Sequence, residues 1–133
     1  LFGEVNYHAA YEPMRSVRTD RYHYIRRFDG RDRWVLPNID DTPTKEYLLA
    51  QGFAHEPREA EMLYDVVMDP DESNNLVHRP ALAHVLGELR TRLERWMRET
   101  NDPLLAGNVP APRGALANRP DGYSPRETPL PIE

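Results

Sequence analysis

The stretch that decides the fold is "YEPMRSVRTDRYHYIRRF", residues 11–28. Side chains alternate along residues 15–19 and again along residues 21–28, with aromatic rings on one face of the second run. Asp20 is a turn former and lies in the "RTDR" between the two runs. The stretch therefore predicts two antiparallel strands joined by a tight hairpin turn.

The same stretch is rich in arginine, which raises the question of a nucleic-acid surface. The 133-residue chain carries 17 Lys+Arg against 22 Asp+Glu, a net charge of -5, and would as a whole repel a phosphate backbone. Alternation also divides the basic groups between the two strand faces and the turn. We therefore expect no nucleic-acid partner, and interpret the stretch as strands with solvated arginines and buried rings.

The segments after the hairpin predict further short elements. "DDTPTKEYLLAQG" has the signals of a short helix, with Asp41 or Thr42 as the cap, a proline in the first turn and Gly52 after the end. We also expect an extended piece at residues 34–36 and a strand at residues 62–67 that Asp69-Pro70 closes.

The clearest element is "PALAHVLGELRTRLERWMRET", residues 80–100. Apolar residues recur at helical spacing on one face, which predicts a long amphipathic helix with a stripe made of Leu82, Leu86, Leu89, Leu93 and Trp96. Gly87 is either a weak point of this helix or a place where another backbone comes close. Together the elements predict an α+β fold, a small antiparallel sheet of about four strands packed against a long helix.

Residues 103–133 differ in composition from the rest of the chain. They hold seven of the thirteen prolines and show little apolar periodicity. This pattern predicts a compact domain over residues 1–102 and an extended Pro-rich tail over residues 103–133. No apolar run is long enough to suggest a membrane span, so we expect no membrane association through one. The sequence starts with Leu-Phe-Gly instead of Met, and we expect it to be a fragment of a longer protein.

The residues that carry catalytic or metal chemistry are sparse. The chain contains no cysteine, and no Ser-His-Asp, Cys-His or phosphate-loop spacing is present. The histidines fall in separate segments without zinc-site spacing, at His8, His23, His55, His78 and His84. We expect neither a metal site nor a catalytic residue in this chain, and the chain alone to be inactive.

"NYHAAYEPMR", residues 6–15, is the best candidate for a binding site. His8, Glu12 and Arg15 place base, acid and guanidinium groups in one short segment, and an arginine offers paired hydrogen bonds to an oxyanion. These residues predict a substrate-binding surface for a sugar or a sulfate group. The alternative is that they bond to one another at a domain junction.

The order of several segments resembles a known family. "EVNYHAAYEPMRSVRTDRYHYIRRF", "LPNIDD", "EMLYDVVMDPDESNNL" and "LRTRLERWMRETNDPLL" follow one another as in the C-terminal region of sulfatases, with the heparan N-sulfatase (sulfamidase) branch as the nearest likeness. The matching segments run from about Glu4 to Leu105. The resemblance implies a small four-stranded antiparallel sheet with a long helix, docked on a large α/β domain.

The resemblance also implies that the catalytic groups belong to the larger domain and not to this chain. Family members use a formylglycine made from the cysteine of a "C-x-[PS]-x-R" motif and a divalent cation, usually calcium, and both belong to the larger domain. This chain has no such motif, so it is expected to hold no cofactor itself. It would be the C-terminal fragment of a hydrolase of sulfuric esters or sulfamates, contributing stability and one wall of the pocket.

The expected partners follow from the placement of catalysis in the larger domain. They are the N-terminal catalytic sulfatase domain of the parent protein and a sulfated sugar as substrate. The alternative hypothesis is a non-catalytic binding or oligomerisation module. Because removal from a catalytic domain would expose an apolar docking face, we expect the isolated chain to self-associate.

Overall fold

The computed structural model describes residues 1–132, which form two compact units. The first unit consists of Leu1–Glu4, Met14–Phe28 and Ala60–Val109, and the second of Val5–Pro13, Asp29–Glu59 and the residues from Pro110 onward.

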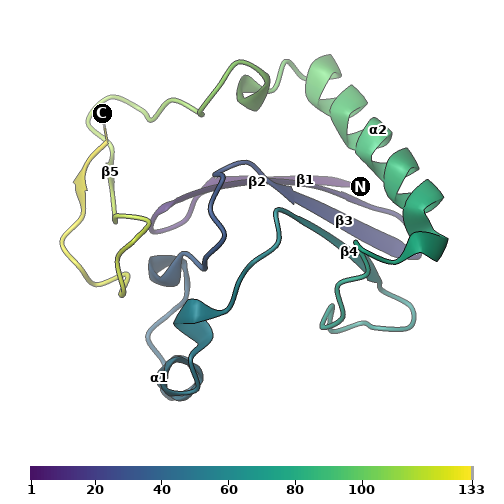
Figure 1. The fold of residues 1–133 in the computed structure, drawn as a ribbon. Coiled ribbons are helices and arrows are strands. Elements are labelled where there is room, and N and C mark those ends of the chain that lie inside the picture. The colour runs from purple at the N-terminus through teal and green to yellow at the C-terminus, as the bar shows by residue number, and fades with distance from the viewer. Residues whose placement is uncertain (133) are drawn as a thin grey trace. The chain divides into compact units, whose positions relative to one another are not determined.

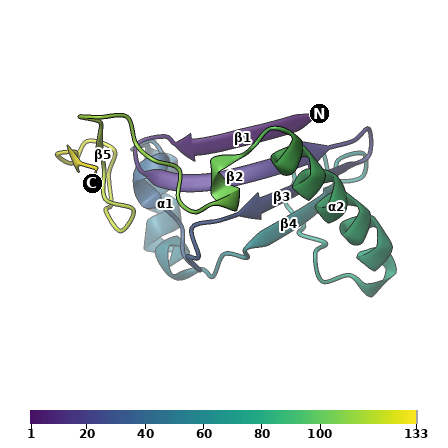
Figure 2. The same cartoon turned by 90° about the horizontal axis from the view of Figure 1, so that it is seen from above.

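Four strands form one antiparallel sheet in sequence order, from β1 to β4 (Figure 2). Their bounds are Phe2–Tyr7 for β1, Tyr11–Arg18 for β2, Tyr22–Arg27 for β3 and Glu61–Asp65 for β4. The β2–β3 turn is closed by the Thr19 N–H, which donates to the Tyr22 carbonyl at 2.8 Å. The hairpin predicted from residues 11–28 is confirmed.

The long helix α2, Ala83–Glu99, packs on one face of the sheet in the first unit (Figure 1). A 3-10 turn at Pro80–Leu82 leads into it. The core joins side chains of three strands to one face of the helix: Val17, Tyr24 and Leu63 with Leu86, Leu89, Leu93 and Met97. The sheet and the helix confirm the predicted α+β class. None of the helices formed by residues 1–132 is long and apolar enough to span a membrane.

The structure corrects one prediction about α2 and decides between two interpretations of Gly87. The predicted stripe ends on Trp96, whereas Met97, four residues after Leu93, is the buried residue, at 1% exposed. Trp96 is half-buried and stacks on Phe2, with ring centroids 5.0 Å apart. A Cβ added to Gly87 would meet nothing within 4 Å, so Gly87 is a local weakness of the helix and not a point of close packing.

The second unit contains the short helix α1, Pro43–Ala50. The Thr42 side chain accepts from the Lys45 N–H, and Gly52 adopts a left-handed conformation with φ 92° after the helix end. The predicted start and stop of this helix are confirmed.

Residues 34–36 were expected to be extended, but the chain forms a 3-10 turn at Leu36–Asn38. Pro37 lies inside this turn, where its fixed φ suits a helical turn and its missing N–H costs no hydrogen bond. The Asn38 N–H closes the turn on the Val35 carbonyl at 3.0 Å. The expectation of an extended piece is therefore wrong at Leu36.

The extended Pro-rich tail expected over residues 103–133 is not shown. Among the described residues of this segment, a 3-10 turn covers Pro103–Leu105, and the short strands β5, Leu116–Ala117, and β6, Leu130–Pro131, pair antiparallel. The turn is capped locally by Asp102, whereas β5 pairs with a strand further along the chain, and apolar periodicity reports neither. The predicted division of the chain at residue 102 stays a prediction.

Candidate functional site

The Asn38 side chain holds the connection between β1 and β2, residues 8–10. Asn38 Oδ1 accepts from the N–H groups of both Ala9, at 3.0 Å, and Ala10, at 2.7 Å. Its Nδ2 donates to the Ala10 carbonyl at 3.3 Å. A second contact comes from the Asn118 N–H, which donates to the Ala9 carbonyl at 2.8 Å. With Ala10 fully buried, the connection is fixed on both sides.

His8 lies exposed on this fixed connection. Its backbone N–H donates to the Ala10 carbonyl at 3.3 Å, which curls the chain into the turn. An exposed imidazole on a backbone that is already ordered can meet a ligand with little further loss of conformational entropy. Of the three predicted site residues, His8 is the one presented to solvent.

Glu12 is buried, at 6% exposed, and bonded within the second unit. Its carboxylate accepts from Asn38 Nδ2 at 2.9 Å and from the Arg58 guanidinium. The Arg58 guanidinium also lies over the Trp34 ring, 4.2 Å from the centroid. Glu12 therefore anchors the side chain that fixes the turn at His8.

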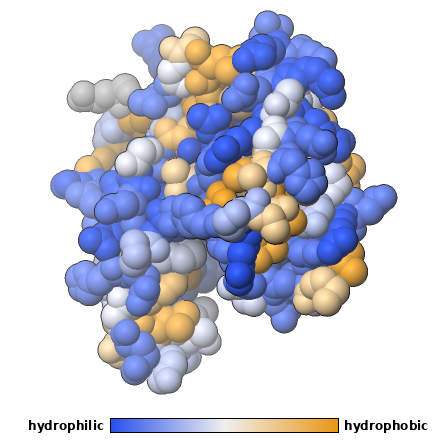
Figure 3. Space-filling view, turned by 45° about the vertical axis from the view of Figure 1, so that its right-hand side comes forward, coloured by the Kyte–Doolittle hydropathy of each residue, from blue (hydrophilic) through white to orange (hydrophobic). Residues whose placement is uncertain are grey.

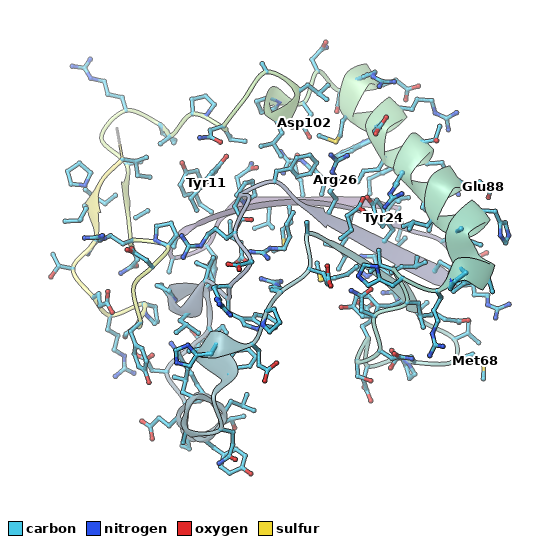
Figure 4. All side chains as sticks on the ribbon, in the orientation of Figure 1. Tyr11, Tyr24, Arg26, Met68, Glu88 and Asp102 are labelled. Atoms are coloured by element: carbon cyan, nitrogen blue, oxygen red, sulfur yellow. The ribbon has the colours of Figure 1, made fainter. Side chains whose placement is uncertain are left out.

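Arg15 belongs to the first unit and is 1% exposed. Its Nε donates to Asp102 Oδ2 at 2.5 Å and its Nη2 to Asp102 Oδ1 at 3.0 Å, a paired contact between buried groups. Nη1 donates to the Met14 carbonyl at 2.8 Å. The binding role predicted for Arg15 stays a prediction. In this chain its guanidinium pairs with Asp102, which follows α2 (Figure 4), and its Nε also lies 3.8 Å from Glu4 Oε2.

A small pocket of about 280 Å³ lies in the second unit. Tyr7 and Tyr11 line it, with their ring centroids 4.8 Å apart and their planes tilted by 45°. Burial, and then the neighbouring Tyr11, raises the pKa of Tyr7, so its hydroxyl stays protonated at neutral pH and can donate. Asn118 and Arg119 also line the pocket.

The basic groups of the hairpin meet carboxylates of the first unit. Arg18 and His23 both contact Glu72, at 2.9 Å and 3.0 Å. Arg21 contacts Asp65 at 2.8 Å, and this hydrogen bond is the largest cause that holds the pKa of Asp65 below its usual range. The stretch that looked basic in the sequence is thus ion-paired in the structure at these positions, and Arg15 and Arg27 are buried instead of solvated.

Among residues 1–132, no three or more His, Asp or Glu side chains gather in a way that could hold a metal ion. The sulfatase resemblance implies a divalent cation in the larger domain, and residues 1–132 of this chain offer no set of ligands that fits such a cation.

Comparison with known proteins identifies the relatives of this chain. No family model matches the sequence. An ulvan-active sulfatase of Formosa agariphila is 31% identical over 120 residues, covering 86% of this chain and 24% of the relative. Human N-sulphoglucosamine sulphohydrolase is 29% identical over 147 residues, covering 98% of this chain and 28% of the relative. This chain is related to the sulfatases.

Two solved sulfatase structures contain a region with a fold similar to that of this chain. A sulfatase candidate from Bacteroides thetaiotaomicron matches 96% of the chain and 23% of its own length, with TM-score 0.57 and 23% identity. A 2-O GAG sulfatase matches the same share of this chain with TM-score 0.55 and 22% identity. The chain spans about a quarter of the length of the curated relatives named above. The resemblance stated from the motif series is confirmed.

Sequence reasoning missed the residues that hold the site together. Asn38 lies in "LPNIDD", a segment that carries the resemblance, but nothing local marks it as the partner of Ala9 and Ala10. Asn118 lies in the segment predicted as an extended tail. One local signal could have pointed to Asn38. It is a polar residue directly after the apolar run Val35, Leu36 and Pro37, and a polar group beside a buried run needs a hydrogen-bond partner.

Proposed function

We propose that this chain is the C-terminal subdomain of a sulfatase that acts on sulfated sugars, and that its β1–β2 connection forms one wall of the substrate pocket. The observation that carries the proposal is the exposed His8 on a turn fixed by Asn38. The relatives named above are sulfatases, one described as ulvan-active and one as acting on N-sulphoglucosamine. Catalysis is assigned to the rest of the parent protein, which would supply the formylglycine and the cation.

In this proposal the three predicted residues have different roles. The His8 imidazole contacts the sulfated sugar, because it is the group that solvent and ligand can reach. Glu12 acts through Asn38, with which it shares a 2.9 Å hydrogen bond. Arg15 secures the first unit through Asp102, and direct contact with the substrate is the further role predicted for it from sequence.

A His8→Ala substitution in the full-length parent tests the pocket wall. We expect KM for a sulfated glucosamine to rise about 10- to 100-fold, the loss of one hydrogen bond to a charged group, with little change in thermal stability. The measurement is sulfate release from an N-sulfated and an O-sulfated glucosamine. His84→Ala is the matched control, because His84 is also exposed and lies on α2.

Two results would contradict the proposal. One is a His8→Ala protein whose KM equals that of the His84→Ala control. The other is a parent reading frame that encodes no "C-x-[PS]-x-R" or "S-x-[PS]-x-R" motif upstream of Leu1, because the parent would then lack the residue that formylglycine is made from.

Self-association is the second candidate function, and exposed apolar side chains favour it. Val67 and Met68, which follow β4, are 64% and 78% exposed, and Met68 projects away from the ribbon (Figure 4). Other apolar side chains reach the surface between polar ones (Figure 3). We expect the isolated chain to sediment as a dimer or larger species, and a Val67→Ser, Met68→Ser variant to sediment as a monomer. A wild-type chain that remains monomeric at millimolar concentration would exclude this function.

A further inference from the structure

The pocket lined by Tyr7 and Tyr11 is a second candidate binding site, and His8 is not among the residues that line it. The rings of Tyr7 and Tyr11 form a tilted aromatic wall, 4.8 Å between centroids. Pro120 and Leu130 also line the pocket and add apolar surface. The C–H bonds on the face of a sugar ring pack well on such a surface, because the face of an aromatic ring carries partial negative charge.

Residues that line the pocket are bonded to other parts of the same unit. Asn118 Nδ2 donates to the Glu127 carbonyl at 2.9 Å, and its backbone N–H donates to Ala9. Strand β5 ends directly before Asn118 and pairs with β6 through Leu116↔Pro131 and Ala117↔Leu130. A site that is formed before binding does not lose affinity to ordering.

The polar edge of the pocket suits an anionic sugar. Arg119 donates to Asp121 from Nε at 3.1 Å and from Nη2 at 3.0 Å, and the two side chains are 68% and 56% exposed. An exposed ion pair of this kind adds little stability, so a sulfate or carboxylate on a ligand can compete for the guanidinium. Tyr7, which lines the same pocket, carries a hydroxyl that can donate.

We propose that this pocket binds a second sugar ring of a sulfated polysaccharide, next to the ring that His8 contacts. The inference rests on the proposed function and extends it from one sugar to a chain of sugars. Tyr7 and His8 are adjacent in sequence, which places the aromatic wall one residue before His8 along the chain. The pocket volume of about 280 Å³ suits a group the size of one sugar ring.

The test compares monosaccharide and oligosaccharide substrates in the full-length parent. For Tyr11→Ala we expect KM for a sulfated tetrasaccharide to rise about tenfold while KM for a sulfated monosaccharide and both kcat values stay unchanged. Tyr11→Phe keeps the ring and is expected to restore the wild-type KM. Tyr47→Ala is the matched control, because Tyr47 is 65% exposed on α1 of the same unit and does not line the pocket.

A second variant covers the case in which Tyr11→Ala lowers the stability of the protein. Arg119→Ala removes an exposed side chain, and we expect it to weaken binding of an anionic tetrasaccharide severalfold and to leave binding of a neutral one unchanged. Equal effects of these variants on mono- and tetrasaccharide would overturn the inference, as would a Tyr11→Phe protein as impaired as Tyr11→Ala.

Binding of a desulfated tetrasaccharide, followed by saturation-transfer NMR on the same full-length proteins, separates this inference from the proposed function. If no sulfate is released from any sugar but Tyr11-dependent binding is seen, the proposed function fails and the pocket assignment holds. If sulfate is released but the desulfated tetrasaccharide does not bind in a Tyr11-dependent way, the proposed function holds and the pocket assignment fails.

Discussion

Replacing Arg15 by methionine is expected to cost about 3–5 kcal/mol of stability, because it leaves the carboxylate of Asp102 buried without its partner. The side chains of Arg15 and Asp102 are 0% and 2% exposed, so solvent cannot take over the lost contact. Asp102 also accepts from the Leu104 N–H at 3.0 Å and so caps the turn at Pro103–Leu105. Urea unfolding of the full chain measures the loss.

The neighbouring Arg18 provides a matched control for this substitution. It lies on the same strand and also contacts a carboxylate, Glu72 at 2.9 Å, but its side chain is 46% exposed. Arg18→Met is expected to cost at most about 1 kcal/mol. Adding Asp102→Asn to Arg15→Met should recover part of the loss, because the buried charge is removed while an acceptor for the Leu104 N–H remains. Equal losses for Arg15→Met and Arg18→Met would contradict the structural role of Arg15.

The same pair gives a dependence on pH. Burial alone would raise the pKa of Asp102, but hydrogen bonds from Arg15 and Leu104 and the Arg15 charge outweigh it and hold the pKa below its usual range. The stabilisation is therefore fully present above the unfolded pKa, about 3.9, and is lost as pH falls through the lower folded pKa. In Asp102→Asn this part of the acid unfolding should disappear. Normal stability together with a raised KM in Arg15→Met would instead support substrate contact.

Replacing Lys45 by methionine is the second large effect, with an expected loss of about 3 kcal/mol. Lys45 is the only lysine of the chain, and it is 3% exposed. Its three N–H donors are shared among four acceptors at 2.8 to 3.0 Å from Nζ: the carbonyls of Leu36, Ile39 and Tyr123 and Asp41 Oδ1. Without the ammonium these buried acceptors lose a charged donor together, which costs more than one ordinary hydrogen bond.

Two measurements check the role of Lys45. Urea unfolding gives the stability, with Glu46→Met as the control, because Glu46 is the exposed neighbour on α1 and its loss should cost less than about 1 kcal/mol. Trypsin digestion gives the local effect. Release of the Tyr123 carbonyl should speed cleavage after Arg126 in Lys45→Met and not in Glu46→Met. A Lys45→Met chain as stable and as resistant as the control would contradict the expectation.

The candidate site was only partly visible in the sequence. His8, Glu12 and Arg15 were singled out because acid, base and guanidinium groups lie within one segment. Short-range patterns cannot tell that Glu12 bonds to Asn38 and Arg58, or that Arg15 meets a carboxylate 87 residues away. Whether a polar group binds a ligand or another part of the chain depends on these long-range partners.

The sequence alone determined the elements whose patterns are local. Alternation and a turn residue gave the β2–β3 hairpin, and 3.6-residue periodicity gave α2, because each pattern is repeated within one continuous segment. The ordered motifs were also enough to indicate the relation to sulfatases. Tertiary structure decided what those segments touch: Met97 as the last core residue of α2, Asn38 and Asn118 as the supports of the turn at His8, and β5 and β6 as part of a pocket. Each of these depends on chain segments that only folding brings together.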